Sequence, residues 1–461
     1  MKILTKFFLT GIIAISAGCK KNFLDAKPDK SLLIPSTLTD FQSLLDNNTV
    51  MNVGTAINTI ASDDIYTNSA TLQSTTVASA RNSYVWAKDI YEGSTPSDWS
   101  TPFQQIFYAN VVLDGLKNIT VSKENEAQWQ KIQAFARFYR GYAYYNLSQV
   151  FASQYNPTAS SLSLGIPIHL TSDVNDRPTR GNLAQTYAQM ILDIQSSIPF
   201  LPKSEIYPTR PIKAAAYALL SKIFLTQSRY QDAKLYADSC LTLKNTLLDY
   251  NTLNSAAARP FPQAMQNGNP EILFYSSMAS YAFLRSATGC LIDSNLFRSY
   301  NDRDLRKASF FTDRGQAMVN FKGSYGGAGV TANFLFCGLA VDEVYLIRAE
   351  CSARLNLIEN ALSDINHLLT KRYRPNAFIP YTTNDRSNLL AIILSEKRKE
   401  LVMRGVRWSE LRRLNQEIET ATSLVRKLNT LTYSLAPNDN RYTFPIPESE
   451  LGDTGLEQNP R

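Results

Sequence analysis

The apolar residues of the chain repeat with helical spacing over most of its length after residue 103. Side chains three, four, seven and eight positions apart lie on one face of an α-helix, so this spacing predicts helices with a buried face. Three stretches follow it closely: Phe135, Phe138, Tyr139, Tyr142 and Ala143; Ala216, Leu219, Leu220, Ile223 and Phe224; and Ala233, Tyr236, Ala237, Cys240 and Leu241. The pattern favours a mostly α-helical protein.

The predicted helices come in pairs joined by short turns. Residues 213–243 form one such pair, with a turn at 226–229, and residues 340–370 form another around Asn356. A helical hairpin of about 34 residues is typical of the tetratricopeptide (TPR) repeat. We therefore expect TPR-type hairpins at about 103–150, 184–243 and 340–370, and a further helix from roughly Ser387 to Asn415.

Three other segments lack helical periodicity, at about 47–102, 155–182 and 254–335. Long loops without structure are uncommon in a compact domain. We therefore expect insertions that contain short helices or strands and pack on the helical scaffold. Because no Pro/Ser-rich linker divides the chain, residues 19–461 are predicted to form a single domain.

The composition excludes several functional classes. The 461 residues include only two histidines, His169 and His367, which rules out a multi-histidine metal site and argues against catalysis by histidine. The net charge of +7 is modest, and the basic residues form no block of the kind that binds nucleic acid. The sequence contains no P-loop, dinucleotide fingerprint or Gly-x-Ser-x-Gly motif. We expect no catalytic site and no cofactor, and the sequence leaves open whether a structural metal ion is bound.

The first nineteen residues predict export and attachment to a lipid. Lys2 and Lys6 precede an apolar stretch, 7–17, that is too short to span a bilayer and fits the core of a signal peptide. Small residues then lead to Cys19, as in the bacterial lipobox, where the cysteine takes a diacylglyceryl group and becomes the new N-terminus. We expect residues 1–18 to be a lipoprotein signal peptide and Cys19 to carry the anchor. The alternative is a plain signal peptide with a chance cysteine.

The other four cysteines show no pattern that indicates chemistry. Cys240, Cys290, Cys337 and Cys351 form no Cys-x-x-Cys pair and have no metal-ligand spacing. Cys240 and Cys351 fall on apolar helix faces, so buried free thiols are expected. Since exported proteins can form disulfides, a bond among the four stays open at this point.

Charged residues concentrate near residue 400. Glu396, Arg398, Glu400 and Arg407 are interpreted as one semi-buried ion-pair network, because charges survive burial when they are paired. Acid–base catalysis by two carboxylates is the less favoured interpretation. The Asp-Arg-Asp sequence at 302–304 is interpreted as a structural turn.

Eight short motifs follow one another along the chain. They are "CKKNFLDAKPD", "DWSTPFQQIFYANVVLDGL", "ARFYRGYAYYNLSQVFA", "GIPIHLTSDVNDRPTRGNLAQTYAQMILDI", "EVYLIRAECSARL", "SEKRKELVMRGVRWSELRRL", "FPIPESEL" and "QNPR". Together they resemble the SusD/RagB family of outer-membrane lipoproteins of the Bacteroidetes, over essentially the whole length. The chain departs from the family pattern at Phe103, Ala152, Arg404 and Glu410, where Tyr, Gly, Glu and Asp are usual.

The resemblance implies a mostly α, SusD-like fold on TPR-type hairpins and a role in nutrient uptake. Proteins of this kind are lipid-anchored in the outer membrane, usually on the cell surface, and work with a SusC-like TonB-dependent β-barrel transporter. The implied ligand is a glycan that the lipoprotein captures and delivers to the barrel. Lys20, Lys21 and Asn22 stand after Cys19 where surface-displayed members often have acidic residues.

A glycan site needs flat apolar faces beside hydrogen-bonding side chains. By resemblance, the ligand site draws on loops of the N-terminal half and on the insertion after the middle hairpin. The residues expected there are Asp64, Tyr66, Arg81, Trp86, Trp99, Tyr275, Tyr281, Phe283 and Arg285. Trp86 and Trp99 lie in or beside the irregular 80–102 region and are candidates for exposure; for Trp99 a core position is the alternative, because it opens a motif that recurs in the family. Trp129 and Trp408 lie in predicted helices and are expected in the core. A structural role is the alternative for each of the nine.

These observations predict a non-enzymatic glycan-binding lipoprotein without nucleic-acid partners. Two alternatives stay open: a family member that binds a peptide or another nutrient, and a TPR scaffold lipoprotein that faces the periplasm.

Overall fold

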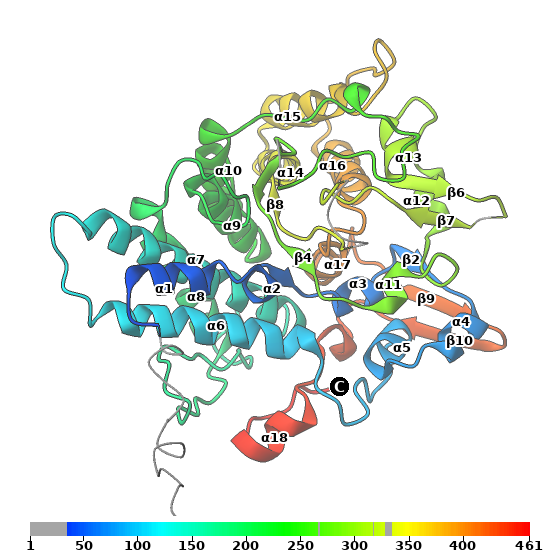
Figure 1. Ribbon diagram of the computed structural model, residues 1–461. Helices are drawn as coiled ribbons and strands as arrows, with labels where there is room; N and C mark the ends of the chain where they lie inside the picture. Colours follow the sequence, from blue (N-terminus) through cyan, green and yellow to red (C-terminus); the bar gives the residue numbers. More distant parts are fainter. Residues whose placement is uncertain (1–34, 266–267, 317, 328–333) are drawn as a thin grey trace, which may run out of the picture.

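The computed structural model describes residues 35–265, 268–316, 318–327 and 334–461. Most of the regular secondary structure is helical, which confirms the predicted fold class (Figure 1). Helices that follow one another pack side by side, as α6 does with α7, α9 with α10, and α14 with α15. The long helices are α6 (Ser97–Leu116), α7 (Glu126–Phe151), α8 (Leu183–Ser197), α9 (Lys213–Thr226), α10 (Tyr230–Leu243), α14 (Val341–Arg354), α15 (Ile358–Thr370) and α16 (Arg386–Glu400).

The hairpins pack through the faces that the apolar spacing predicts. On α7, Phe135, Phe138 and Tyr139 are almost completely buried. On α9, the small side chains of Ala215 and Ala216 are buried as well, and they allow neighbouring helices to approach closely. Burying one large apolar side chain contributes about 1.5–3 kcal/mol, so these faces hold the scaffold together.

Shorter helices connect and cover the hairpins. They are α1 (Leu38–Leu45), α2 (Asn48–Met51), α3 (Ile57–Ala61), α4 (Ser69–Ser74), α5 (Ala78–Tyr84), α11 (Ala282–Arg285), α12 (Ser294–Arg298), α13 (Leu305–Phe310), α17 (Arg407–Leu414) and α18 (Glu448–Thr454), with 3₁₀ turns η3 (Ile198–Phe200), η4 (Tyr250–Thr252) and η5 (Asn440–Tyr442). Helix α1 begins where Thr37 and Asp40 form a reciprocal capping box.

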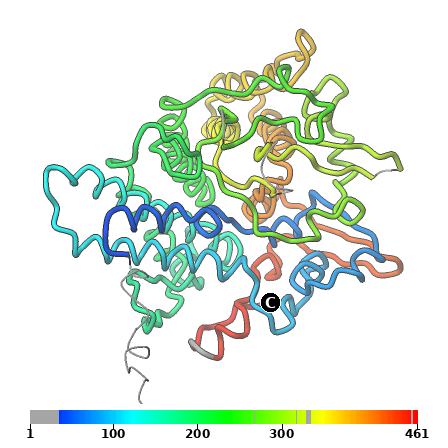
Figure 2. The backbone as a smooth tube through the Cα atoms, in the orientation of Figure 1, coloured from blue at the N-terminus to red at the C-terminus, as the bar shows by residue number. Residues whose placement is uncertain are grey.

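The strands of the described residues form two-stranded sheets. The pairs are β1 (Val53–Gly54) with β4 (Ser277–Met278), β2 (Ile65–Tyr66) with β5 (Leu291–Ile292), β3 (Ile272–Phe274) with β8 (Leu339–Ala340), β6 (Phe311–Asp313) with β7 (Val319–Phe321), and β9 (Leu424–Leu428) with β10 (Leu431–Leu435). Only the β1–β4 pair is parallel. The first two pairs tie the segment after α2 to the segment after β3, and both segments lie on the same side of the molecule (Figures 1 and 2). The irregular segments are thus structured, and they pack on each other as well as on the helices.

The prediction of a single helix from Ser387 to Asn415 is wrong. Helix α16 ends at Glu400, and α17 starts only at Arg407. Between them Met403 and Gly405 adopt left-handed backbone conformations, with φ of 57° and 75°, which an α-helix does not accommodate. The chain therefore turns, and α17 packs against α3 in the N-terminal half.

The four cysteines in the described part of the chain are free thiols. Cys240, Cys290 and Cys351 are buried and Cys337 is half-buried. Burial raises the pKa of the first three to about 12, so these thiols are unreactive in the folded protein.

The predicted signal peptide, 1–18, and Cys19 lie outside the described residues. Among the helices that are described, none combines the length and the apolar character needed to cross a membrane.

Candidate ligand-binding site

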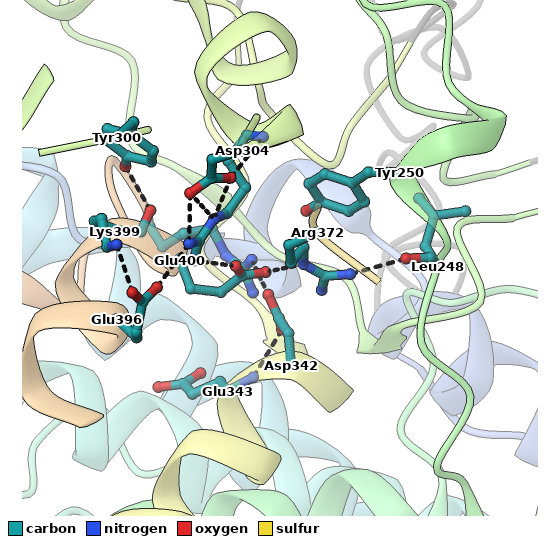
Figure 3. Close-up of polar contacts among 12 residues, drawn as sticks. Leu248, Tyr250, Tyr300, Asp304, Asp342, Glu343, Arg372, Glu396, Lys399 and Glu400 are labelled. Carbon is teal, nitrogen blue, oxygen red and sulfur yellow. Dashed lines mark hydrogen bonds and ion pairs between the residues drawn. The ribbon is translucent and has the colours of Figure 1, made fainter. Parts of the chain in front are cut away.

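A buried cluster of charged side chains lies where α13, α14 and α16 meet (Figure 3). At its centre the guanidinium of Arg306 contacts Asp304 at 2.7 Å, Glu396 at 2.6 Å and Glu400 at 3.1 Å. All four side chains are at most 2 % exposed. Asp304 also caps α13 by accepting from the backbone N–H of Arg306, so the predicted structural turn at 302–304 is confirmed.

A second arginine extends the cluster. Arg372 contacts Glu400 at 2.7 Å and donates to the backbone carbonyl of Leu248 at 2.8 Å (Figure 3). It also contacts Glu271 at 2.7 Å. Oxygens of Glu271, Asp342 and Glu400 lie within 4.8 Å of one another. Burial raises the pKa of Glu271 to about 7, opposed by the charge of Arg372.

This cluster is a structural element. Each of its carboxylates has a basic partner: Arg306 and Arg372 together contact four of them, Lys399 also contacts Glu396, and Arg404 contacts Asp342 at 3.1 Å. The side chains are sealed from solvent, so a substrate has no access to a carboxylate pair there.

The four residues Glu396, Arg398, Glu400 and Arg407 do form ion pairs, as predicted. The prediction that they form one network is wrong, because they belong to two. Arg398 and Arg407 turn away from the two glutamates and contact Asp63, at 3.1 Å and 2.7 Å. Positions two apart on a helix point in nearly opposite directions, so Glu396 and Arg398 cannot share one network. The second network joins α16 and α17 to the N-terminal segment.

The two tryptophans expected at the ligand site are buried, so their predicted exposure is wrong. Trp86 is 2 % exposed, donates from Nε1 to the carbonyl of Ala61 at 3.0 Å, and lies under the guanidinium of Arg426. Trp99 is 3 % exposed, near the start of α6, and its ring packs on Phe103 and Phe151. Segment 47–102 folds into the core instead of remaining a loose insertion, so neither indole face is open to a ligand.

Four more of the expected residues are buried. Tyr275, Tyr281 and Phe283 are 5–6 % exposed, and Asp64 is 2 % exposed. The hydroxyl of Tyr281 donates to Asp98 at 2.6 Å. Burial raises the pKa of Asp64 to about 6, against the charge of Arg398. These residues support the fold around the insertion.

The remaining three are at least partly exposed. Tyr66 is half-buried on β2. Arg81 pairs with Glu92 at 2.6 Å and donates to the carbonyl of Thr75, so its charge is already compensated. Arg285 ends α11, is exposed, and donates to the hydroxyl of Ser280. Of the nine expected residues, Arg285 is the one that lines the cavity described next.

A cavity of about 280 Å³ opens within the insertion, close to the lower end of the range of about 300–1,000 Å³ usual for small-molecule sites. Its walls come from the end of α11 and the loop after it, the β6–β7 hairpin, and Met403 beyond α16. The polar and aromatic side chains that line it are Arg259, Arg285, Ser286, Thr312, Arg314, Asn320, Phe321, Lys322, Ser324 and Phe334.

The sequence pointed to the segment that forms the cavity but missed most of its side chains. All the residues just named fall within 254–335, the stretch without helical periodicity. One local pattern could have indicated two of these side chains. Thr312 and Arg314 alternate with Asp313 and line the cavity together, as residues two apart along an extended chain do.

A larger cavity, of about 440 Å³, lies beside the C-terminus between Tyr91, Ile446 and Arg461. Two of its polar side chains are already occupied: Tyr91 donates to the carbonyl of Pro445, and Arg461 donates to the carbonyls of Ala87 and Thr443. The cavity within the insertion is the better candidate for a ligand because it lies in a segment where the ligand site is expected and is lined by Arg285, one of the expected residues.

Two family models match the chain. Residues 22–225 match a family described as "Starch-binding associating with outer membrane", and residues 317–461 match one described as "SusD family". A comparison with curated proteins gave no match.

Solved structures share the fold over nearly the whole chain. A putative sugar binding protein from Bacteroides vulgatus is 19% identical, with a TM-score of 0.74 over 93% of this chain and 99% of that one. A SusD superfamily protein from Bacteroides thetaiotaomicron is also 19% identical, with a TM-score of 0.72 over 92% and 100%. A SusD-like carbohydrate binding protein from Bacteroides vulgatus has a TM-score of 0.68 at 19% identity, over 92% and 98%. The two SusD-type family models together match most of the chain, so the chain belongs to the SusD family.

Proposed function

We propose that this protein is a lipid-anchored, surface-exposed binding protein of the outer membrane that captures an oligosaccharide or polysaccharide. It then delivers this ligand to a SusC-like TonB-dependent transporter. The proposal is supported by the family, by the sugar-binding relatives of the same fold, and by the lipobox at Cys19. No step requires a catalytic residue.

The cavity within the insertion is the observation that carries the proposal. Partly exposed rings of Phe321 and Phe334 offer apolar faces to the C–H groups of a sugar. Thr312 and Asn320 offer hydrogen-bonding groups beside them. Flat apolar faces with a few polar groups are what a sugar ring needs for recognition.

Binding is tested with a variant that fills the cavity without changing its charge. Ala287 lines the cavity and is exposed, so Ala287→Trp should block any ligand there. Ala127→Trp, at an exposed position near the start of α7, is the matched control. We expect a glycan array and calorimetry on the purified protein to detect a glycan that the control binds normally and Ala287→Trp binds at least about tenfold more weakly. Equal binding by both variants would refute this site.

Delivery and display need separate measurements. Affinity purification from solubilised outer membranes should recover a TonB-dependent β-barrel with the protein, and protease added to intact cells should cut it. Full protection from protease, alongside cleavage of a known surface protein, would favour the periplasmic scaffold. Peptide binding without glycan binding would favour the other nutrient-binding alternative.

The absence of catalysis is tested on the ligand that binds. The purified protein should release no reducing sugar from it during long incubation. Release that disappears in a single carboxylate variant would overturn the non-enzymatic proposal.

A further inference from the structure

We infer that the ligand of the cavity is an anionic glycan, a chain of sugars that carries carboxylate or sulfate groups. This inference rests on the function proposed above and names its substrate class. Four basic side chains line the cavity: Arg259, Arg285, Arg314 and Lys322. None of the described residues of its wall carries a carboxylate.

Several arginines elsewhere in the molecule are already paired with carboxylates, whereas Arg426 and Arg461 donate to backbone carbonyls instead. Arg81 has Glu92 within 2.6 Å, Arg210 has Asp46 within 2.6 Å, and the buried arginines of the central cluster each contact carboxylates. In the part of the chain that the structure describes, no carboxylate pairs with Arg285, Arg314 or Lys322. Their positive charges are therefore available to a ligand.

The backbone of the hairpin keeps the nearest acidic side chain away from the cavity. Asp313 lies between Thr312 and Arg314, and neighbouring residues of a strand point to opposite faces. Thr312 and Arg314 line the cavity and Asp313 does not. Asp313 instead accepts a hydrogen bond from the backbone N–H of Gly315, within the turn after the strand.

Lys322 is half-buried, whereas Arg285 and Arg314 are exposed. Its ammonium donates to the backbone carbonyls of Ser255 and Ala257, at 2.7 Å and 3.3 Å. Burial lowers the pKa of Lys322, and no carboxylate is present in the described wall to offset this effect. An anion bound in the cavity would supply the missing negative charge, so Lys322 favours an anionic ligand for the same reason as the two arginines.

The uncharged groups of the wall favour a sugar over a simple inorganic anion. The side-chain oxygen of Asn320 is buried and has no hydrogen-bond partner within the described residues. It is held in place because Asn320 Nδ2 donates to the carbonyls of Ala287 and Cys290. An unpaired acceptor needs a donor, and a sugar hydroxyl is one, whereas an inorganic sulfate ion has none to offer. The rings of Phe321 and Phe334 can then contact the face of the same sugar.

The experiment compares five ligands, two of which, hexagalacturonate and its methyl ester, differ mainly in charge. Calorimetry on the full-length protein uses hexagalacturonate, its neutral methyl ester, a chondroitin sulfate hexasaccharide, maltohexaose and hexaglutamate. We expect one of the two acidic glycans to bind at least about tenfold more tightly than both neutral ones, with an affinity that falls as salt is added. Binding of hexagalacturonate would show that carboxylate groups suffice, whereas binding of the chondroitin sulfate alone, which carries both carboxylate and sulfate groups, would show that hexagalacturonate's carboxylates do not suffice.

Variants then test whether the basic side chains of the cavity cause this preference for acidic glycans. Arg285→Gln with Arg314→Gln should weaken the acidic ligand about tenfold or more and leave a neutral ligand unaffected. Arg298→Gln is the matched control, because Arg298 is exposed on α12 and does not line the cavity.

Each other outcome overturns the inference in a recognisable way. Binding of the neutral glycans alone, or binding of acidic ones that ignores the double variant, refutes the anionic class and leaves the proposed function standing. Tight binding of hexaglutamate alone refutes both and indicates an acidic peptide. Absence of binding to all five probes refutes the anionic class, and the glycan array described above then decides the proposed function separately.

Discussion

Trp86 and Arg285 share an expected role in ligand binding, and the structure separates them by burial. The indole of Trp86 is enclosed by backbone and by Arg426, whereas the guanidinium of Arg285 is exposed at a cavity. Aromatic rings contribute equally well to a core or to a sugar platform. Residue type therefore cannot distinguish the two roles, and only the position of the ring relative to solvent decides.

The buried charged cluster gives the first prediction. Arg372→Met leaves the carboxylates of Glu271 and Glu400 buried with one partner fewer. Because an uncompensated buried charge is costly, we expect the free energy of unfolding to fall by about 3–5 kcal/mol. The control is Lys371→Met, which removes only a partly exposed contact to Asp249 and should cost at most about 1 kcal/mol. Urea unfolding measures both, and equal losses would contradict the structural role of Arg372.

A second prediction concerns pH. Burial opposes ionisation of Asp63, but the charges of Arg407 and then Arg398 prevail and lower its pKa from 3.8 to about 2. The folded state thus holds the carboxylate more strongly than the unfolded state does. Its stabilisation, about 2 kcal/mol, is fully present well above pH 4 and is lost as the pH falls towards 2.

The variant Asp63→Asn should therefore destabilise the protein by about 2 kcal/mol at pH 7 and by about half as much at pH 3. Urea unfolding at the two pH values checks this. Asp232→Asn, which removes an exposed ion pair with Arg229, should have little effect at either pH. A loss for Asp63→Asn that does not change with pH would show that its charge is not the cause.

At the scale of elements, the turn between α16 and α17 was the clearest failure of the helical pattern. Polar and apolar residues continue with helical spacing through this segment, yet Gly405 has a φ of +75° there. The turn brings Arg407 to Asp63 and so attaches α17 to the N-terminal half. A contact between residues more than 300 positions apart leaves no trace in a local pattern.

The turn itself gives the third prediction. Gly405→Ala should lower the free energy of unfolding by about 1–2 kcal/mol, because a residue with a Cβ is strained in the left-handed region. Space is not the cause, since the added carbon would lie 3.4 Å from Met278 Cε, its nearest neighbour. Gly452→Ala, in the exposed helix α18 with open space around it, should be neutral or slightly stabilising. Thermal and urea unfolding compare the two, and equal effects would exclude backbone strain.

At the scale of the whole molecule, the hydrophobic core consists of two clusters of buried residues. One lies among the hairpins and includes Cys240, and the other lies under the insertion and includes Cys290. Arg426 on β9 links the parts by donating to the carbonyl of Ala61 at 3.0 Å and to that of Tyr84. Such links favour cooperative unfolding of both clusters, and the single domain predicted for residues 19–461 stays a prediction.

The buried thiols give the fourth prediction. If the clusters unfold together, Cys240 and Cys290 should become reactive to an alkylating agent at the same urea concentration, within about 0.5 M. Peptide mass spectrometry after a short labelling pulse reports each thiol separately. Earlier labelling of Cys290 would mean that the insertion opens as an independent unit.

The sequence by itself determined the helical hairpins, the family and the segment that carries the cavity. Helical periodicity and short motifs are local, so they can be read without knowing which segments meet. Tertiary structure alone decided that Trp86 and Trp99 are buried, that Arg398 turns to Asp63, and that Arg259, Arg285, Arg314 and Lys322 gather around one cavity. Those facts depend on the packing of residues far apart in the chain, and burial and charge pairing are properties of that packing.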